Sequence, residues 1–165
     1  MGIKIRAYKT SDAEAIVETL NYYILNSTAL YDYEPRTLEQ QQSIFDEKLK
    51  KGFPVIVATI EERVVGFGYY SEFRFREAYK FTVEHSVYVA PTEHGKGIGK
   101  VILQNLIRLA KEQKLHTMIG VIDAENESSI AFHEQFGFTT VGIIKESGYK
   151  FDRWLNSVIM QLMLN

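Results

Sequence analysis

The chain carries two kinds of hydrophobic pattern, which predict strands and helices in turn. Residues 3–8 alternate apolar and polar side chains, as a half-buried strand does. Residues 13–25 instead repeat apolar side chains at helical spacing, after candidate capping residues at 10–12. By the same criteria we expect helices over 37–52, 100–114 and 126–137, two strands over 54–75 turned at 61–63, strands over 79–90 and 116–123, and two last strands over 138–164 with Gly148 in their turn.

The predicted order of elements, β-α-α-β-β-β-α-β-α-β-β, indicates an α/β fold. Such an order builds a mixed sheet with helices on its faces. Residues 116–123 are almost continuously apolar, which favours a central strand covered on both sides. We find no internal repeat or linker, and 165 residues fit a single domain over 1–165.

Composition narrows the classes of function. The chain has no cysteine, which excludes disulfides, thiolate metal sites and a cysteine-linked covalent intermediate. Its formal net charge of −2 and the lack of a basic stripe argue against binding to nucleic acid. The basic residues near the start leave no apolar core for a signal peptide, and no run of about 18 apolar residues exists to span a membrane. We therefore expect a cytoplasmic protein without a membrane segment.

Seven residues between a predicted strand and a predicted helix, HGKGIGK at 94–100, contain three glycines. The first amides of a helix lack helical partners, so a glycine-rich turn there can bring N–H groups close to a phosphate. The spacing excludes a P-loop, because Lys100 is followed by Val101 rather than serine or threonine. It also excludes the dinucleotide fingerprint, which would need a glycine at position 100. A plain turn that starts a helix is the alternative.

This stretch is similar to the pyrophosphate loop of the Gcn5-related N-acetyltransferase superfamily. That motif reads Arg or Gln, two residues, Gly, one residue, then Gly or Ala; Gly97 and Gly99 occupy its glycine positions, and His94 stands where Arg or Gln is usual. The strand order and the segment NESSIAFHEQFGF also fit, so the resemblance covers essentially the whole chain. The segments TVEHSVYV, STALYDYEPRT and GYKFDRWLNSVIMQ further resemble the phosphinothricin and methionine sulfoximine N-acetyltransferases.

Glu84 is the candidate general base. An amine with a pKa of about 8 to 10 is mostly protonated at neutral pH and must lose a proton before it attacks. Strand alternation puts Glu84 on one face with Thr82, Ser86 and Tyr88, between apolar neighbours, where a carboxylate is unusual. A strand glutamate paired with a lysine such as Lys80 is the structural alternative. The resemblance implies that the base of the reaction stands at position 84.

His133 is the second catalytic candidate. It stands where many superfamily members have a tyrosine that protonates the leaving thiolate, and an imidazole can do this near neutral pH. A hydrogen-bonded histidine on a helix face is the alternative. We expect no metal, because His85 and His94 lie on different elements and no carboxylate spacing accompanies them.

The resemblance also implies how acetyl-CoA binds. The backbone of Val87, Tyr88 and Val89 would face the pantetheine arm and the acetyl carbonyl. The pyrophosphate would be held by Gly95, Lys96, Gly97, Ile98, Gly99 and Lys100. Asn126 would bind the pantetheine or serve as a helix cap.

The acceptor end offers two groups of candidates. Arg74, Arg76 and Tyr79 suit a carboxylate or phosphinate of the acceptor, since guanidinium forks bind such oxyanions, or else they form a solvated rim. Tyr31, Tyr33 and Trp154 are candidates for the wall of an amino-acid pocket, or else they are plain core.

We therefore predict an acetyl-CoA-dependent N-acetyltransferase that passes the acetyl group directly to a small amino-acid-like substrate, such as methionine sulfoximine or phosphinothricin. Members of this subgroup are often dimers, so the resemblance predicts a homodimer. Two alternatives stay open. One is a different acceptor, such as a polyamine, an aminoglycoside or a peptide N-terminus, and the other is a CoA-binding sensor without catalysis.

Overall fold

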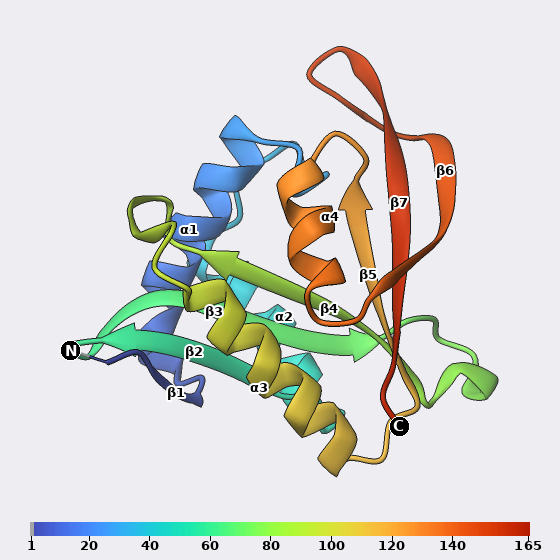
Figure 1. The fold of residues 1–165 in the computed structure, drawn as a ribbon. Coiled ribbons are helices and arrows are strands. Elements are labelled where there is room, and N and C mark those ends of the chain that lie inside the picture. The colour runs from blue at the N-terminus through green and yellow to red at the C-terminus, as the bar shows by residue number, and fades with distance from the viewer. Residues whose placement is uncertain (1) are drawn as a thin grey trace.

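The computed structural model describes residues 2–165, and seven strands within them form one mixed sheet in the order β1-β2-β3-β4-β5-β7-β6 (Figure 1). The strands are β1 (Lys4–Ala7), β2 (Val55–Ile60), β3 (Arg63–Glu72), β4 (Thr82–Val89), β5 (Thr117–Asp123), β6 (Thr139–Lys150) and β7 (Arg153–Met163). The helices are α1 (Ala13–Asn26), α2 (Leu38–Lys50), α3 (Ile98–Glu112) and α4 (Glu127–Glu134). The predicted α/β class and the predicted order of elements are confirmed.

Helices cover both faces of the sheet, as Figure 1 shows. On one face α3 buries Ile102, Leu103 and Leu106 in a core with the sheet, and Ile130 and Phe132 of α4 pack at its border. On the other face Leu20 of α1 and Phe45 of α2 pack against β2 and β3. Each helix thus buries the apolar stripe that its sequence period predicts.

Two glycines of β3 let α3 approach the sheet closely. A Cβ at Gly68 would lie 2.5 Å from Cγ2 of Ile102 and 3.1 Å from the Ser86 carbonyl. Glycine in a strand often marks such a close backbone approach. The contact fixes α3 against the middle of the sheet, so its first turn lies beside the end of β4.

The last hairpin turns three residues later than predicted. Strands β6 and β7 pair as far as Lys150 and Arg153, so the turn consists of Phe151 and Asp152, at φ angles of 53° and 59°. Gly148 lies inside β6 and is buried, because the ring of Tyr31 packs where its Cβ would stand. The prediction that placed Gly148 in the turn is therefore wrong: this glycine serves a close contact and not a bend.

None of the helices within residues 2–165 is long and apolar enough to cross a membrane.

Candidate active site

The parallel strands β4 and β5 separate halfway along their length. They pair only over Thr82–Glu84 and Thr117–Ile119, although β4 continues to Val89 and β5 to Asp123. Figure 1 shows the two strands diverging from that point, with α4 beside β5. Backbone groups that face the gap have no strand partner there, which leaves them available to a ligand.

The register of β4 decides which of its residues face the gap. Backbone hydrogen bonds join Thr82 and Ala90 to the chain of β3, so the even-numbered residues between them also direct their backbone toward β3. The odd-numbered Val87 and Val89 direct their N–H and C=O groups into the gap. The Tyr88 carbonyl instead lies against Gly66 of β3.

A cavity of about 800 Å³ runs from this gap to the start of α3. All the predicted cofactor residues line it except Lys96, whose ammonium group forms a 2.6 Å ion pair with Glu93 instead. Asn126 caps α4, because its side-chain oxygen accepts the Ser129 N–H at 3.1 Å. The cavity therefore joins β4, the glycine loop and α4.

The glycine loop has the backbone geometry that only glycine adopts easily. Gly95 and Gly97 lie at φ angles of 79° and 76°, in the left-handed region. The first hydrogen bond of α3 runs from Val101 N–H to the Gly97 carbonyl, so the amides of residues 98–100 have no helical partner. Together with the helix dipole, these amides make an anion-binding end.

Tyr23 of α1 reaches across to this loop. Its hydroxyl lies 2.6 Å from the Val89 carbonyl oxygen and 2.7 Å from Nε2 of His94. Burial raises the pKa of Tyr23 to about 12, so the hydroxyl keeps its proton at neutral pH. The residue thus connects the end of β4 to the side chain that opens the loop.

Glu84 lies where β4 and β5 begin to separate. Within residues 2–165 its carboxylate makes no ion pair, and Lys80 instead lies over the Phe81 ring at 5.1 Å. Burial raises the pKa of Glu84 above its ordinary value, while the charges of Lys48 and Arg74 oppose this shift. A half-buried carboxylate without an ion-pair partner suits proton transfer.

His133 and His85 form a buried pair at the base of the gap. Their Nε2 atoms lie 2.9 Å apart. The Nδ1 atom of His133 lies 2.7 Å from the Ser129 carbonyl, and that of His85 lies 3.0 Å from the Ile119 carbonyl. Both ring nitrogens of His133 are thus engaged by protein atoms, so proton transfer to a ligand requires its contact with His85 to open.

When both rings are neutral, the histidine pair has one N–H donor fewer than its three contacts require. The two carbonyls and the contact between nitrogens each need an N–H donor, which makes three, whereas two neutral imidazoles carry two. Burial lowers the pKa of His85 and of His133, which favours the neutral forms. Gly120 is small where both rings pack: its Cβ would lie 3.1 Å from His85.

The predicted acceptor residues lie apart from one another. Arg74 lines a second cavity, of about 480 Å³, between α2 and the end of β3. Arg76 lies over Phe75 and Tyr79 packs on Phe73, both at the exposed rim. Trp154 is 62% exposed on the last hairpin, where it packs on Tyr149.

Lys48 of α2 is the acceptor-side residue that sequence reasoning missed. Its ammonium group lies 3.3 Å from the Ser71 hydroxyl, and Ser71 is the cross-strand neighbour of Glu84. In the second cavity Lys51 is neutralised by Glu72 at 2.6 Å, which leaves Lys48 and Arg74 as the positive charges beside Glu84. Nothing in the sequence period of α2 distinguishes this lysine from its neighbours.

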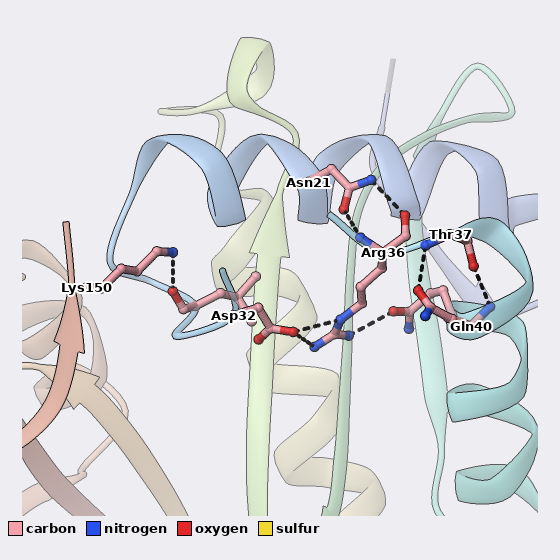
Figure 2. Close-up of polar contacts among 8 residues, drawn as sticks. Asn21, Asp32, Arg36, Thr37, Gln40 and Lys150 are labelled. Atoms are coloured by element: carbon pink, nitrogen blue, oxygen red, sulfur yellow. Dashed lines mark hydrogen bonds and ion pairs between the residues drawn. The ribbon is translucent and has the colours of Figure 1, made fainter. Parts of the chain in front are cut away.

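The connection between α1 and α2, residues 27–37, is held in place by polar contacts (Figure 2). The buried Lys150 donates to the carbonyls of Ser27 and Leu30, at 2.9 and 2.6 Å. Arg36 binds Asp32 at 3.0 Å, and its backbone exchanges hydrogen bonds with the Asn21 side chain. The segment is therefore a fixed wall, and it carries Tyr31, whose hydroxyl lies 3.4 Å from Ser157 on β7.

A metal site is not evident: within residues 2–165 no group of three or more His, Cys, Asp or Glu side chains is arranged to hold an ion.

Comparisons with known proteins agree on one family. A model of the acetyltransferase (GNAT) domain matches residues 5–159. The L-methionine sulfoximine/L-methionine sulfone acetyltransferase of Pseudomonas aeruginosa is 37% identical over 166 residues, which cover 100% of this chain and 96% of that protein. An N-acetyltransferase structure from Staphylococcus aureus superposes with a TM-score of 0.98 at 38% identity, over 100% of both chains. A phosphinothricin acetyltransferase from Sinorhizobium meliloti, solved in complex with acetyl-CoA, gives a TM-score of 0.96 at 36% identity, over 100% of this chain and 90% of that one.

Proposed function

Because this chain belongs to the acetyltransferase (GNAT) domain family and is an N-acetyltransferase that uses acetyl-CoA, we propose that its acceptor is the amino group of a small amino-acid-like molecule of the methionine sulfoximine or phosphinothricin type. The observation that carries the proposal is Glu84, a half-buried carboxylate flanked by Lys48 and Arg74. This arrangement offers a base for an ammonium group and two cations for an acidic group on the same small molecule.

The large cavity fits acetyl-CoA. Gly95 and Gly97 have positive φ angles and no side chains that would keep a ligand away from the loop backbone. The amides of residues 98–100 have no helical partner, which suits binding of the pyrophosphate of acetyl-CoA. The gap-facing amides of Val87 and Val89 suit the pantetheine amides and the acetyl carbonyl, and Asn126 lies on the opposite wall. Acetyl-CoA supplies an activated acetyl thioester, and these groups hold it in the gap.

In this proposal Glu84 removes the proton of the acceptor ammonium, directly or through one water. Burial raises its pKa toward neutrality and so strengthens it as a base. The charges of Lys48 and Arg74 oppose this shift, because they favour the ionised carboxylate. The N–H groups of β4 would stabilise negative charge that develops on the carbonyl oxygen.

Transfer is proposed to be direct, within a complex that holds both substrates. The chain has no cysteine to carry an acetyl group. Glu84 lies on the face of β4 toward α1 and α2, whereas His85 lies on the face toward α3 and α4, so the gap connects an acceptor side to a cofactor side.

His133 is the proposed donor of a proton to the leaving thiolate. It lines the cofactor cavity, and its Nε2 is the nitrogen that is not tied to its own helix. Donation requires the histidine pair to hold one proton more than its neutral form, so that Nε2 of His133 carries an N–H, and it requires the 2.9 Å contact with His85 to open.

The acceptor carboxylate would bind between Lys48 and Arg74, which both line the second cavity, whereas Arg76, Tyr79 and Tyr31 are not among its lining residues. A polyamine or an aminoglycoside carries several positive charges and would favour an acidic pocket, so the two cations beside Glu84 argue against it. A peptide N-terminus offers no free carboxylate near its amine, and a CoA-binding sensor would have no use for an unpaired base. Trp154, on the exposed hairpin, has no role in this proposal.

The test is release of free CoA from acetyl-CoA with methionine sulfoximine, methionine sulfone, phosphinothricin, spermidine and a short peptide as acceptors. We expect turnover with the first three, and a fall in kcat of about 100-fold or more in Glu84→Gln with CoA binding retained. Glu112→Gln, which removes an exposed, paired carboxylate at the end of α3 and outside both cavities, is the control that keeps its activity. Turnover on spermidine or the peptide alone would exclude the proposed acceptor, and CoA binding without any turnover would favour the sensor.

A further inference from the structure

The hydroxyl of Tyr23 determines which nitrogen of His94 carries a proton. It contacts the Val89 carbonyl at 2.6 Å and Nε2 of His94 at 2.7 Å. A carbonyl oxygen can only accept, so the single hydroxyl proton is donated to Val89. The hydroxyl must then accept from His94, whose Nε2 is therefore protonated.

Because Tyr23 keeps Nε2 of His94 protonated, Nδ1 is the nitrogen that gains or loses a proton. With Nε2–H fixed by Tyr23, a neutral His94 ring has a lone pair on Nδ1, which a phosphate oxygen would repel. Within residues 2–165 no hydrogen bond occupies Nδ1, and the ring lines the cavity beside Gly95 and Gly97. Only the doubly protonated ring can donate from Nδ1, and it does so with a full positive charge.

We propose that His94 binds the pyrophosphate of CoA as an imidazolium, so that CoA binding takes up a proton near neutral pH. The inference rests on the proposed seat of the pyrophosphate at the glycine loop. A histidine at this position differs from an arginine or a glutamine. Neither of those side chains changes its charge between about pH 5 and pH 8, whereas an imidazole does.

The other titratable groups around the loop each have a favoured charge state, set by burial or by an ion pair. Tyr23, from α1, has a pKa of about 12 because it is buried. Glu93 is paired with Lys96 and Arg63, which hold its pKa below the ordinary value and keep it ionised. From α3 and α4 the facing groups are Lys100 and His133, and burial lowers the pKa of His133 as it does that of His85 on β4. His94 is thus the group whose protonation the anion would change.

The sign of the pH effect follows. A bound anion favours the imidazolium over the neutral ring, so binding at alkaline pH takes up a proton. Affinity is then highest at acidic pH, where the ring already carries the proton, and it falls to a lower, constant value as pH rises.

The experiment is calorimetric titration with dephospho-CoA, which keeps the pyrophosphate but lacks the 3′-phosphate that would itself titrate. From about pH 5.5 to about pH 8 we expect the affinity of the wild type to fall about tenfold, with net proton uptake measured in buffers of different ionisation enthalpy. In His94→Arg the affinity should stay near its acidic value at every pH. In His94→Gln it should stay near the lower, alkaline value.

Two further variants separate this role from a general effect on folding. Tyr23→Phe frees the neutral ring to place its proton on Nδ1, so the pH dependence should flatten while the ring stays in place. His116→Gln changes an exposed histidine next to β5, outside the cavity, and should keep the slope of the wild type.

A pH-independent affinity in the wild type, or an unchanged slope in His94→Gln, overturns the proposal for His94. Failure of the folded wild type to bind dephospho-CoA at any pH overturns the pyrophosphate seat itself, and with it the proposed cofactor site.

Discussion

In the candidate active site, the charge and pKa of individual residues depend on neighbours from other elements. Glu84 comes from β4, but its charge balance depends on Lys48 of α2 and on Arg74 beyond β3. Burial makes this carboxylate a stronger base, and the two cations limit the effect. The same cations are the proposed seat of the acceptor carboxylate, so charge recognition and base strength are coupled at one place.

Lys48→Met should shift the pH dependence of activity. Removing the ammonium group raises the pKa of Glu84 further, because the charge that opposes burial is lost. Since the proposed base would work in its ionised form, above its pKa, the acidic limb of the kcat/KM profile should move to higher pH. The KM for the acceptor should also rise.

The matched control for Lys48→Met is Lys50→Met, at the exposed end of the same helix, which should leave the profile unchanged. An acidic limb that does not move in Lys48→Met would mean that Lys48 does not act on the base.

At the scale of elements, the junction of β1 and α1 is fixed by a charge pair rather than by a helix cap. Residues 10–12 were expected to cap α1, and they form a short 3₁₀ turn instead. The buried Asp12 binds Arg6 through two contacts, of 2.7 and 2.8 Å, and accepts the Lys9 N–H at 2.8 Å. Burial alone would raise the pKa of Asp12, but the Arg6 guanidinium and the Lys9 amide outweigh it and hold the pKa below its ordinary value.

Asp12→Asn should lower the free energy of unfolding by about 2 kcal/mol at neutral pH, the usual range for a lost charged hydrogen bond. Because the pKa of the folded state is the lower one, the contribution is present above the unfolded value of 3.8 and is lost as pH falls through the folded value. Urea unfolding at several pH values measures this.

The difference between the wild type and Asp12→Asn should thus shrink in acid. Glu14→Gln, an exposed acid in the first turn of α1, is the control that should unfold like the wild type. A difference that stays constant down to the most acidic pH would contradict the assignment to the charge pair.

At the scale of the whole molecule, β6 forms one edge of the sheet and exposes apolar side chains. Val141, Ile143 and Ile144 are 54%, 57% and 53% exposed. An exposed edge strand with apolar side chains is a ready surface for another chain. We propose that residues 1–165 form a single N-acetyltransferase domain and that two copies associate through this edge as a homodimer.

Ile143→Lys should therefore convert a dimer into a monomer, because it places a charge in the apolar contact. Light scattering after size-exclusion chromatography measures the mass of each species. Leu49→Lys, at an exposed leucine of α2, is the control and should stay dimeric. A wild type that is monomeric at all concentrations would rule out the proposed association.

Much of this molecule could be predicted from local sequence. The order of all helices and strands was predicted, because each buries one face and repeats apolar residues with its own period. The bare loop at Gly95 and Gly97 was predicted too, since only glycine adopts its backbone angles easily. Alternation along β4 likewise predicted that Glu84 and His85 lie on opposite faces.

Contacts between distant segments could not be predicted in this way. His85 and His133 are 48 residues apart, and Lys150 reaches Ser27 over 123 residues. Lys48 reaches the position of Glu84 only because α2 packs across the sheet, and Gly148 proved to be a packing contact of Tyr31. The sequence by itself thus determined the elements, the loop and the family, because these depend on local periods and short motifs. The gap between β4 and β5 and the partners of each titratable group were decided only by the tertiary structure, because they depend on how the elements pack.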